Sequence, residues 1–403
     1  MQVAWTHPLS IGEGAPFDGA APLHWDGERV VIPVHRHAFD REARSREEAK
    51  RGYQFDLHRV ASNGAATVTS FEIDAALPAS AWSFLTLPNE LLLHVGTFHR
   101  VPSGERVEAL PFADASEFAG RGVFHWHAGL LVFTGGRGSK IFCFDTDAGE
   151  VRWTLEPSNG RSASVAPVAC QDGELVCSAR DGLIYVDIAR GVVLRRRSLP
   201  GIDRLFPPVE FEGDLLFPYA NRASGGLVRF ASGTGDVAWK CVRRGQITPT
   251  KGHRLLVHER TAVLSVNGGS SLVGVDVDTG ETRWSFRAQW LYTPLEVDGS
   301  SIIFGTAGGH GRHLRRHDVR TGETEWAVPM KGGCPYYARC GECLVAGDWN
   351  GVLRSVRATD GVVVDEARVG PHLAGPPLVV GDRIYVLRWS PDGAGTALLA
   401  LDV

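Results

Sequence analysis

Long apolar runs and an excess of positive charge are both missing from this sequence. No stretch reaches the roughly 18 apolar residues of a membrane span, and residues 1–20 have no basic start followed by an apolar run. Lysine and arginine number 42 against 46 aspartates and glutamates, giving a net charge of -4. We therefore expect a cytoplasmic protein with no membrane segment. We expect no nucleic-acid partner, because such a partner usually requires a clearly basic face.

Methionine is scarce and cysteine is scattered. The chain has only 2 Met beside 48 Gly and 22 Pro, a balance that favours tight turns and β-structure over helix. Its seven cysteines are an odd number and lack the arrangement of a disulfide framework. We expect an all-β chain with reduced thiols.

Sequence signatures of common catalytic sites are missing as well. There is no nucleophile elbow, Walker A sequence or dinucleotide fingerprint. Cys340 and Cys343 have the spacing of a zinc or redox pair, but they flank a predicted tight turn and no second pair completes a tetrahedral site. The histidine clusters at 35–37, 125–127 and 310–317 have no carboxylate at a fixed spacing, so we predict no metal.

What the chain does contain is a repeated turn. The sequence FDTDAGEVRW at 144–153 recurs as VDVDTGETRW at 275–284 and as HDVRTGETEW at 317–326. A glycine stands four residues before each tryptophan, and weaker copies extend the series. The turn glycines are Gly64, Gly104, Gly149, Gly191, Gly235, Gly280, Gly322 and Gly361. Their spacing of 39 to 45 residues indicates one structural unit repeated along the chain.

Each repeat is predicted to hold four β-strands. Alternating apolar residues on both sides of the turn glycine predict a hairpin, and a second pair of apolar runs lies upstream, as in 166–179 and 207–219. Four strands in about 43 residues match one blade of a WD40-like β-propeller.

The two chain ends are predicted to complete one blade. Residues 396–403 match the strand before a repeat turn, and residues 2–9 match the strand after it. Pairing of these strands would close the ring and remove exposed sheet edges. The prediction is a closed propeller of antiparallel blades with nine repeats, or eight as the alternative, forming a single domain over 1–403 with a charged insert at 36–52.

The turn-plus-tryptophan motif resembles the PQQ-type (quinoprotein-like) propeller repeats of PQQ-dependent alcohol dehydrogenases and of the outer-membrane assembly lipoprotein. The resemblance covers nearly the whole chain and is clear in the units ending at Trp153, Trp239, Trp284, Trp326 and, circularly, Trp5. It implies that these rings pack between adjacent blades, with Arg195 and Asp365 replacing tryptophan in two units. The relatives commonly have eight blades, so a count of nine departs from the family.

The resemblance does not extend to the cofactor. The chain has no adjacent cysteine pair, no CxxCH haem site and no export signal of the kind that the quinone enzymes carry. We expect no cofactor and no PQQ binding, because a repeat family does not bring its cofactor with it.

Function is expected on the face with the longer loops. In a propeller blade, connections from the fourth strand to the next blade and from the second to the third strand share one face. The first kind contributes Arg161, Arg204, Arg244, Arg287, Trp290, Tyr292 and Tyr336, and the second kind contributes His35, His37, His258, His310 and Trp389. Arginine with aromatic rings suits an anionic ligand that has a flat apolar part. The alternative is that these loops are polar only because they are solvated.

The leading hypothesis is a binding or scaffold propeller whose loop-rich face recognises a protein partner or a small anionic or aromatic molecule. The alternative is an enzyme of lyase, cyclase or hydrolase type, with histidine and arginine acting in an axial pocket. The sequence leaves both open.

Overall fold

The computed structural model describes residues 1–9, 23–35, 53–73, 83–86, 91–94, 98–101, 124–135, 140–145, 147–148, 150–156, 166–171, 173–179, 182–199, 201–206, 208–221, 224–231, 234–244, 255–266, 269–288, 290–291, 293–308, 311–334, 336–389 and 396–402. All regular structure in these ranges is β-strand, and they form nine antiparallel sheets. The all-β propeller architecture is confirmed, and the nine sheets match the nine repeats counted in the sequence. No helix in the described ranges is long and apolar enough to cross a membrane.

By its contacts the chain divides into two compact units. Unit 1 comprises Met1–Glu108, Arg312–Leu314 and Trp326–Val403, and unit 2 comprises Ala109–Gly311 and Arg315–Glu325. Within each sheet we letter the strands A to D in repeat order, so that A–B and C–D turns lie at one end and B–C and D–A connections lie at the other. The predicted charged insert at 36–52 lies outside the described residues.

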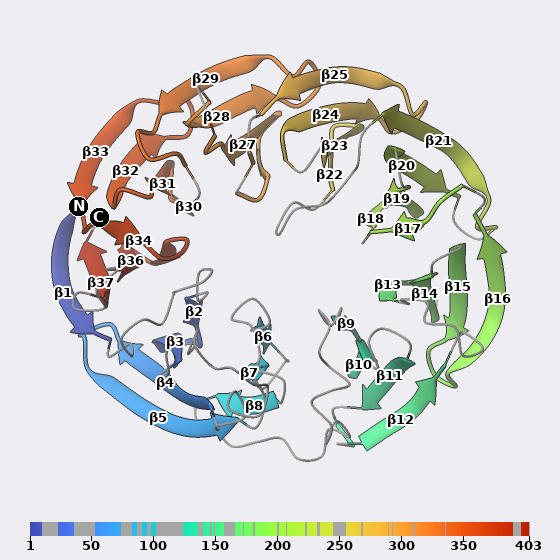
Figure 1. Cartoon of the computed structure of the whole chain (residues 1–403), viewed down its shortest axis with the longest axis horizontal. Coiled ribbons are helices and arrows are strands. Elements are labelled where there is room, and N and C mark those ends of the chain that lie inside the picture. Colours follow the sequence, from blue (N-terminus) through green and yellow to red (C-terminus); the bar gives the residue numbers. More distant parts are fainter. Residues whose placement is uncertain are drawn as a thin grey trace, which may run out of the picture. The chain divides into compact units, whose positions relative to one another are not determined.

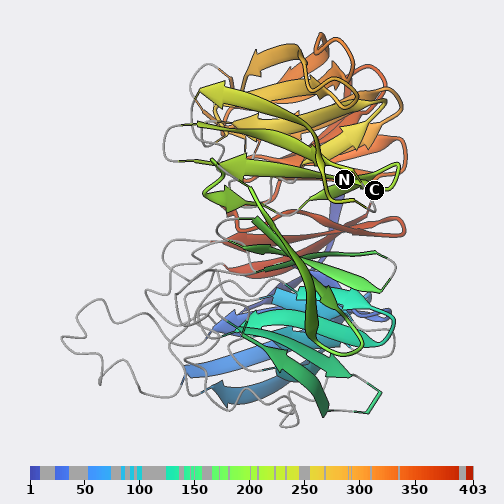
Figure 2. The same cartoon turned by 90° about the vertical axis from the view of Figure 1, so that its right-hand side faces the viewer.

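Unit 2 contains four complete sheets (Figure 1). The first two are β9 (Phe124–His127), β10 (Leu130–Gly135), β11 (Lys140–Asp145) and β12 (Glu150–Leu155), then β13 (Ala166–Gln171), β14 (Glu174–Ala179), β15 (Gly182–Asp187) and β16 (Val192–Ser198). The next two are β17 (Arg204–Leu205), β18 (Val209–Phe211), β19 (Asp214–Ala220), β20 (Ser224–Phe230) and β21 (Val237–Arg244), then β22 (Leu256–His258), β23 (Thr261–Val266), β24 (Ser271–Asp276) and β25 (Thr282–Arg287). Figure 2 shows the twist of these sheets from the side.

Unit 1 also contains four sheets. Two are β2 (His24–Trp25), β3 (Arg29–His35), β4 (Tyr53–Ala61) and β5 (Ala66–Ile73), and the three described strands β6 (Ser83–Thr86), β7 (Leu91–His94) and β8 (Phe98–Val101). The others are β30 (Tyr336–Cys340), β31 (Cys343–Gly347), β32 (Val352–Arg357) and β33 (Val363–Arg368), and β34 (His372–Leu373), β35 (Leu378–Val380), β36 (Arg383–Trp389) and β37 (Ala397–Asp402) with β1 (Gln2–Pro8). The ninth sheet, β26 (Glu296–Asp298), β27 (Ser301–Gly305), β28 (His313–Asp318) and β29 (Thr324–Pro329), contains the division between the units.

The strand β1 completes the last sheet, as the sequence predicts. It pairs antiparallel with β37, from Gln2 opposite Asp402 to Pro8 opposite Ala397, and both ends of the chain lie at this hairpin-like pair (Figure 1). β37 is therefore covered on both edges, by β36 and by β1. The first residues of the chain supply the D strand of the blade whose A, B and C strands come last.

The inner strands are apolar because both of their faces are covered. β23 and β27 are buried along their whole length, and β36 and β37 contribute Tyr385, Leu387 and Leu398 to the core of unit 1. The D strands alternate instead, as in β12 and β16, because one face packs inward and the other meets solvent.

Each motif tryptophan joins its own sheet to the next one. In unit 2 the Trp284 indole Nε1–H donates to Val319 O at 2.9 Å, and the ring lies against Gly322 in the same C–D turn. A Cβ on Gly322 would lie 2.6 Å from the ring, so only glycine permits this approach. The other indoles donate in the same way, Trp5 to Ser62 O, Trp153 to Ile188 O, Trp239 to Val277 O and Trp326 to Ala358 O, over 2.8 to 3.0 Å. The predicted packing of these rings between adjacent blades is confirmed.

Where the motif lacks tryptophan, polar groups take its place. Arg195 stacks over the Tyr185 ring at 4.0 Å from the centroid and pairs with Glu174. The Tyr185 hydroxyl then lies against the next turn glycine, Gly235, while Arg197 donates to Thr234 O at 2.7 Å. The second replacement, Asp365, pairs with the N-terminal ammonium group of Met1.

Candidate functional site

Trp290 is the most exposed aromatic side chain among the described large hydrophobic residues. It lies in the D–A connection after β25, is 58% exposed and has a positive φ of 66°. Bulky residues rarely adopt this backbone conformation, and it persists only where the surrounding structure imposes it. The connection therefore exposes a large apolar ring to solvent, and the backbone that carries this ring is locally strained.

The backbone around Trp290 is held by contacts on both sides. Ala288 N–H donates to Ser270 O and Leu291 N–H donates to Gly269 O, each at 2.9 Å. Trp290 O accepts a hydrogen bond from Ala307 N–H at 3.1 Å. Leu291 is 3% exposed and forms a β-bridge with Thr306, so the residue after Trp290 is anchored in the core of unit 2. The indole is consequently displayed on a fixed backbone.

Arg287 is an exposed cation close to Trp290 along the chain. It is the last residue of β25, with Ser271 as its ladder partner, and it precedes Trp290 by three residues. Of the arginines predicted to converge, Arg161 lies outside the described residues, as do the side chains of Arg204 and Arg244, although β17 and β21 hold their backbones. The convergence of the four guanidinium groups stays a prediction.

Apart from His258, the remaining predicted site residues fall into two groups. His37, Tyr292, His310 and the side chain of His35 lie outside the described part of the chain. Tyr336 and Trp389 are half-buried in unit 1, where Tyr336 packs on the core beside β37 and Trp389 lies 5.4 Å from the His372 ring. Those two contacts are with this chain's own side chains.

The placement of His258 in a B–C connection is wrong. His258 ends the short A strand β22 and flanks the A–B turn, with Thr261 as its ladder partner. Its Nε2 lies 2.7 Å from Gly299 O, in the A–B turn of the next sheet. The error arises because β22 has only three residues, so the sequence pattern assigned the B strand to the wrong apolar run.

Asp348 also has a structural role. It is fully buried in the B–C turn after β31, and its carboxylate accepts hydrogen bonds from the backbone N–H groups of Asn350 and Val352 at 2.9 and 3.0 Å. Arg354 lies 3.8 Å from its other oxygen. The Asp348 carboxylate thus shapes its own turn.

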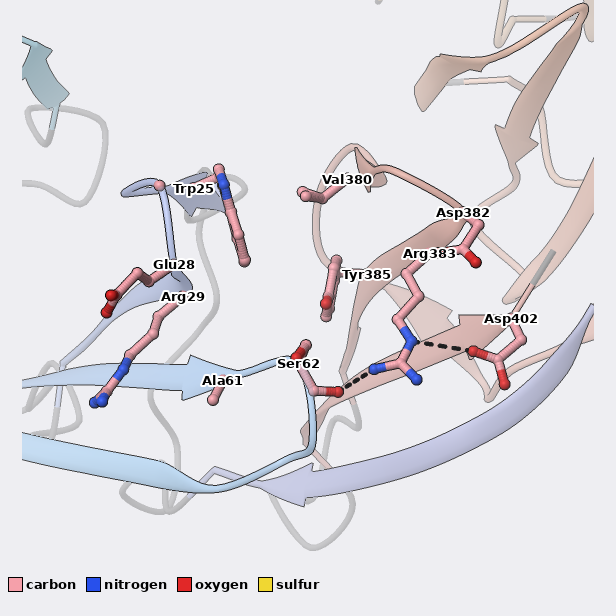
Figure 3. A pocket seen from close by; sticks show the side chains of 11 residues that line it. Trp25, Glu28, Arg29, Ala61, Ser62, Val380, Asp382, Arg383, Tyr385 and Asp402 are labelled. Atoms are coloured by element: carbon pink, nitrogen blue, oxygen red, sulfur yellow. Dashed lines mark hydrogen bonds and ion pairs between the residues drawn. The ribbon is translucent and has the colours of Figure 1, made fainter.

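A groove of about 900 Å³ opens on the tight-turn end of unit 1, between the sheet of β2–β5 and the sheet completed by β1 (Figure 3). Trp25 and Tyr385 face each other there with ring centroids 6.5 Å apart. Arg383 donates to Asp402 at 3.1 Å and also to Ser62 O, which ties the A–B and C–D turns together. Sequence reasoning missed this groove because tight turns carried no loop-length signal.

In unit 2, ion pairs connect the A–B and C–D turns of neighbouring sheets. Arg260 joins Glu212 of the preceding sheet to Asp278 of its own C–D turn, and Arg229 also lies 3.6 Å from Asp278. Hydrogen bonds from Arg260 lower the pKa of Asp278. These exposed networks position the turns of adjacent sheets, and no group of three or more potential metal ligands occurs in the described residues.

The fold and the indole contacts define this molecule as a β-propeller of the PQQ-like repeat class. A family model described as outer membrane protein assembly factor BamB matches residues 100–289 and 223–403. These matches span well over half of the chain, and the chain belongs to this family.

Solved structures resemble the chain at low sequence identity. The computationally designed Ika8 protein is 12% identical with a TM-score of 0.52, over 99% of this chain and 100% of that one, a likeness of fold alone. BamB from Moraxella catarrhalis is 16% identical with a TM-score of 0.47, over 82% and 97%. A europium-containing methanol dehydrogenase is 10% identical with a TM-score of 0.44, over 100% and 93%. No curated protein sequence matches the chain.

Proposed function

We propose that this chain is a protein-binding scaffold whose loop-rich face contacts a protein partner through Trp290. The observation that carries the proposal is an indole that is 58% exposed on a strained backbone fixed by hydrogen bonds. Tryptophan is among the residues most enriched at the energetic centres of protein interfaces. A fixed backbone lowers the entropy lost when such a residue is buried by a partner.

A protein partner fits this geometry better than a small molecule does. Small ligands usually bind in concave sites that bury most of their surface, whereas Trp290 projects outward from its connection. The matching family model is described as an assembly factor, and such a role is consistent with binding a protein partner. Arg287, exposed three residues earlier, adds a cation that favours a partner with an acidic side chain beside an apolar pocket.

The test uses a substitution that separates binding from stability. Trp290→Gly removes the indole but suits the positive φ of 66°, so the variant should unfold no earlier than the parent. Loss of an interface tryptophan should cost about 2 kcal/mol, roughly a 30-fold weaker affinity. Partners captured by the full chain would be quantified by mass spectrometry and then measured in direct binding assays.

The matched control is Val242→Ala. Val242 is 63% exposed on the D strand β21 and has no part in the proposed contact. A partner that binds the parent and Val242→Ala but not Trp290→Gly supports the proposal. Equal binding to all three proteins would overturn it.

A further inference from the structure

Two of the seven cysteines face each other across a tight hairpin. Cys340 ends β30 and Cys343 begins β31, and the two are ladder partners across the two-residue turn of Gly341 and Glu342. The turn is fixed by Gly341, whose φ is 57°. Both cysteines are free and half-buried. In the described strand pairings, no other two cysteines are partners.

The spacing of such partners suits a disulfide. Directly opposed residues in an antiparallel pair have Cα atoms about 4.5 or 5.5 Å apart, within the range of about 4.4 to 6.8 Å found in disulfides. Their side chains point to the same face of the sheet. Their Cβ atoms, about 4.5 to 5.5 Å apart, must approach to nearer 3.8 Å, so the bond would be strained and easily reduced.

The surroundings favour redox chemistry over a metal. A structural zinc site needs four ligands, and the described residues contain no cluster of even three candidate ligands. Burial raises the pKa of Cys340, and the nearby Cys343 and the Asp382 carboxylate of the neighbouring hairpin add to the shift. The thiolate of Cys340 is therefore scarce at neutral pH, which slows exchange without preventing it.

We propose that Cys340 and Cys343 form a reversible intrachain disulfide by exchange with a low-molecular-weight disulfide such as oxidised glutathione. One cysteine thiolate attacks a glutathione sulfur, and the first glutathione leaves as a thiolate. The second cysteine thiolate then attacks the mixed disulfide at the protein sulfur, and the second glutathione leaves. The two cysteines lose two protons and two electrons, and one oxidised glutathione becomes two reduced glutathiones.

The role inferred for this bond is redox response rather than stabilisation. Disulfides stabilise mainly by restricting long loops in the unfolded chain, and this one would close only a two-residue turn. Strained and accessible disulfides are the labile ones that follow the surrounding redox poise. Asp382, whose charge acts on Cys340, also lines the groove of Figure 3. The cysteine hairpin therefore lies beside that groove.

The experiment incubates the reduced full-length chain with excess oxidised glutathione at about pH 8, where more thiolate is present. Free thiols are then alkylated, and the tryptic peptide of residues 340–354 is analysed by mass spectrometry. The expected result is a peptide lighter by two hydrogens, carrying neither glutathione nor alkyl group. Dithiothreitol should restore both thiols.

Two variants make the result specific. Cys340→Ser should retain glutathione on Cys343, because no second thiol can displace it. Cys170→Ser, which changes a half-buried cysteine in another sheet, should still form the bond. A parent chain that keeps both thiols, or that carries glutathione without the internal link, overturns the proposal. Circular dichroism of each variant verifies that the sheets are intact.

Discussion

In the C–D turns that lie against a motif tryptophan, the turn glycine is required by that tryptophan as well as by the turn itself. Gly322 and Gly299 both have a positive φ, 72° and 62°, but only Gly322 lies against an indole. A Cβ at Gly322 would lie 2.6 Å from the Trp284 ring, while a Cβ at Gly299 would meet nothing within 4 Å. The two positions therefore separate backbone strain from loss of packing.

We predict that Gly322→Ala destabilises the chain more than Gly299→Ala does. Both variants incur about 1 to 2 kcal/mol of backbone strain, but only Gly322→Ala must also displace a packed ring, for about 1 to 3 kcal/mol more. Urea unfolding of the two variants measures the difference. Equal losses would mean that the indole contact adds nothing at this turn.

His317 makes the stability of unit 2 sensitive to acid. The side chain is fully buried, lies 4.5 Å from the Phe286 ring, and has Nδ1 3.1 Å from Gly322 O. Burial lowers its pKa to about 4, with Arg315 acting in the same direction. The neutral imidazole stabilises the fold fully above about pH 6.5, and this contribution is lost as the pH falls toward 4.

We predict that the parent loses up to about 3 kcal/mol between pH 7 and 4 that His317→Gln does not lose. His7 and His24 also have lowered pKa values and the same pH dependence, but they are present in both proteins. The difference between the two proteins therefore reports His317 alone. Parallel curves of melting temperature against pH would contradict the assignment.

At the residue scale, the sequence predicted contacts better than it predicted sites. The fixed spacing of glycine and tryptophan implied inter-blade packing, and five indoles confirm it. The exposure and strain of Trp290 could not be predicted, because both depend on hydrogen bonds to Gly269 and Ala307, which lie in different connections. His258 was misplaced because it ends a three-residue strand, and a strand this short leaves little pattern in the sequence.

At the element scale, the B, C and D strands left the clearer pattern, and A strands were predicted where an upstream apolar run marked them, as β13 within 166–179 and β18 within 207–219. Strands such as β23 and β36 are long and apolar, and their partners have clear turns. The A strands are short, and in two sheets the A position is divided between two segments, β17 with β18 and β34 with β35. Few residues in such strands can show an alternating pattern, so their boundaries come only from tertiary pairing.

The strand β1 is the element on which the last blade depends. We predict that deleting residues 1–8 exposes the edge of β37 and removes the Trp5 contact with Ser62 and Gly64, at a cost of at least about 3 to 5 kcal/mol. Trp5→Ala keeps the strand pairing and should cost less. Melting temperature and aggregation would be measured for both variants, and an unchanged melting temperature after the deletion would show that β1 does not complete this sheet.

At the scale of the whole molecule, the chain ends are equivalent to an ordinary C–D turn that has been cut. In the repeat of β24 and β25, the residues joining Asp276 to Thr282 are Val277, Asp278, Thr279, Gly280 and Glu281. Asp276 Oδ1 accepts hydrogen bonds from the N–H groups of Asp278 and Thr279. Asp402 corresponds to Asp276 and Trp5 corresponds to Trp284, so Met1, four residues before its tryptophan, stands at the place of Gly280. Between Val403 and Met1 the chain ends therefore lack only Asp-Thr, and Met1 takes the place of the turn glycine.

We predict that a circular permutant in which Asp-Thr-Gly replaces Met1 between Val403 and Gln2, and which is opened between Ala189 and Arg190, folds to the same sheets. The new turn would replace the ion pair of Met1 with Asp365 by a covalent link, and the new ends would lie at exposed residues of the turn between β15 and β16. Some stability should be lost, because the opened turn holds Gly191 against Trp153.

A second permutant opened inside β15, between Ile184 and Tyr185, should not fold, because it interrupts buried ladder pairs. Circular dichroism and urea unfolding distinguish the two, and failure of the first permutant with the same severity as the second would mean that the ends are not a cut repeat turn.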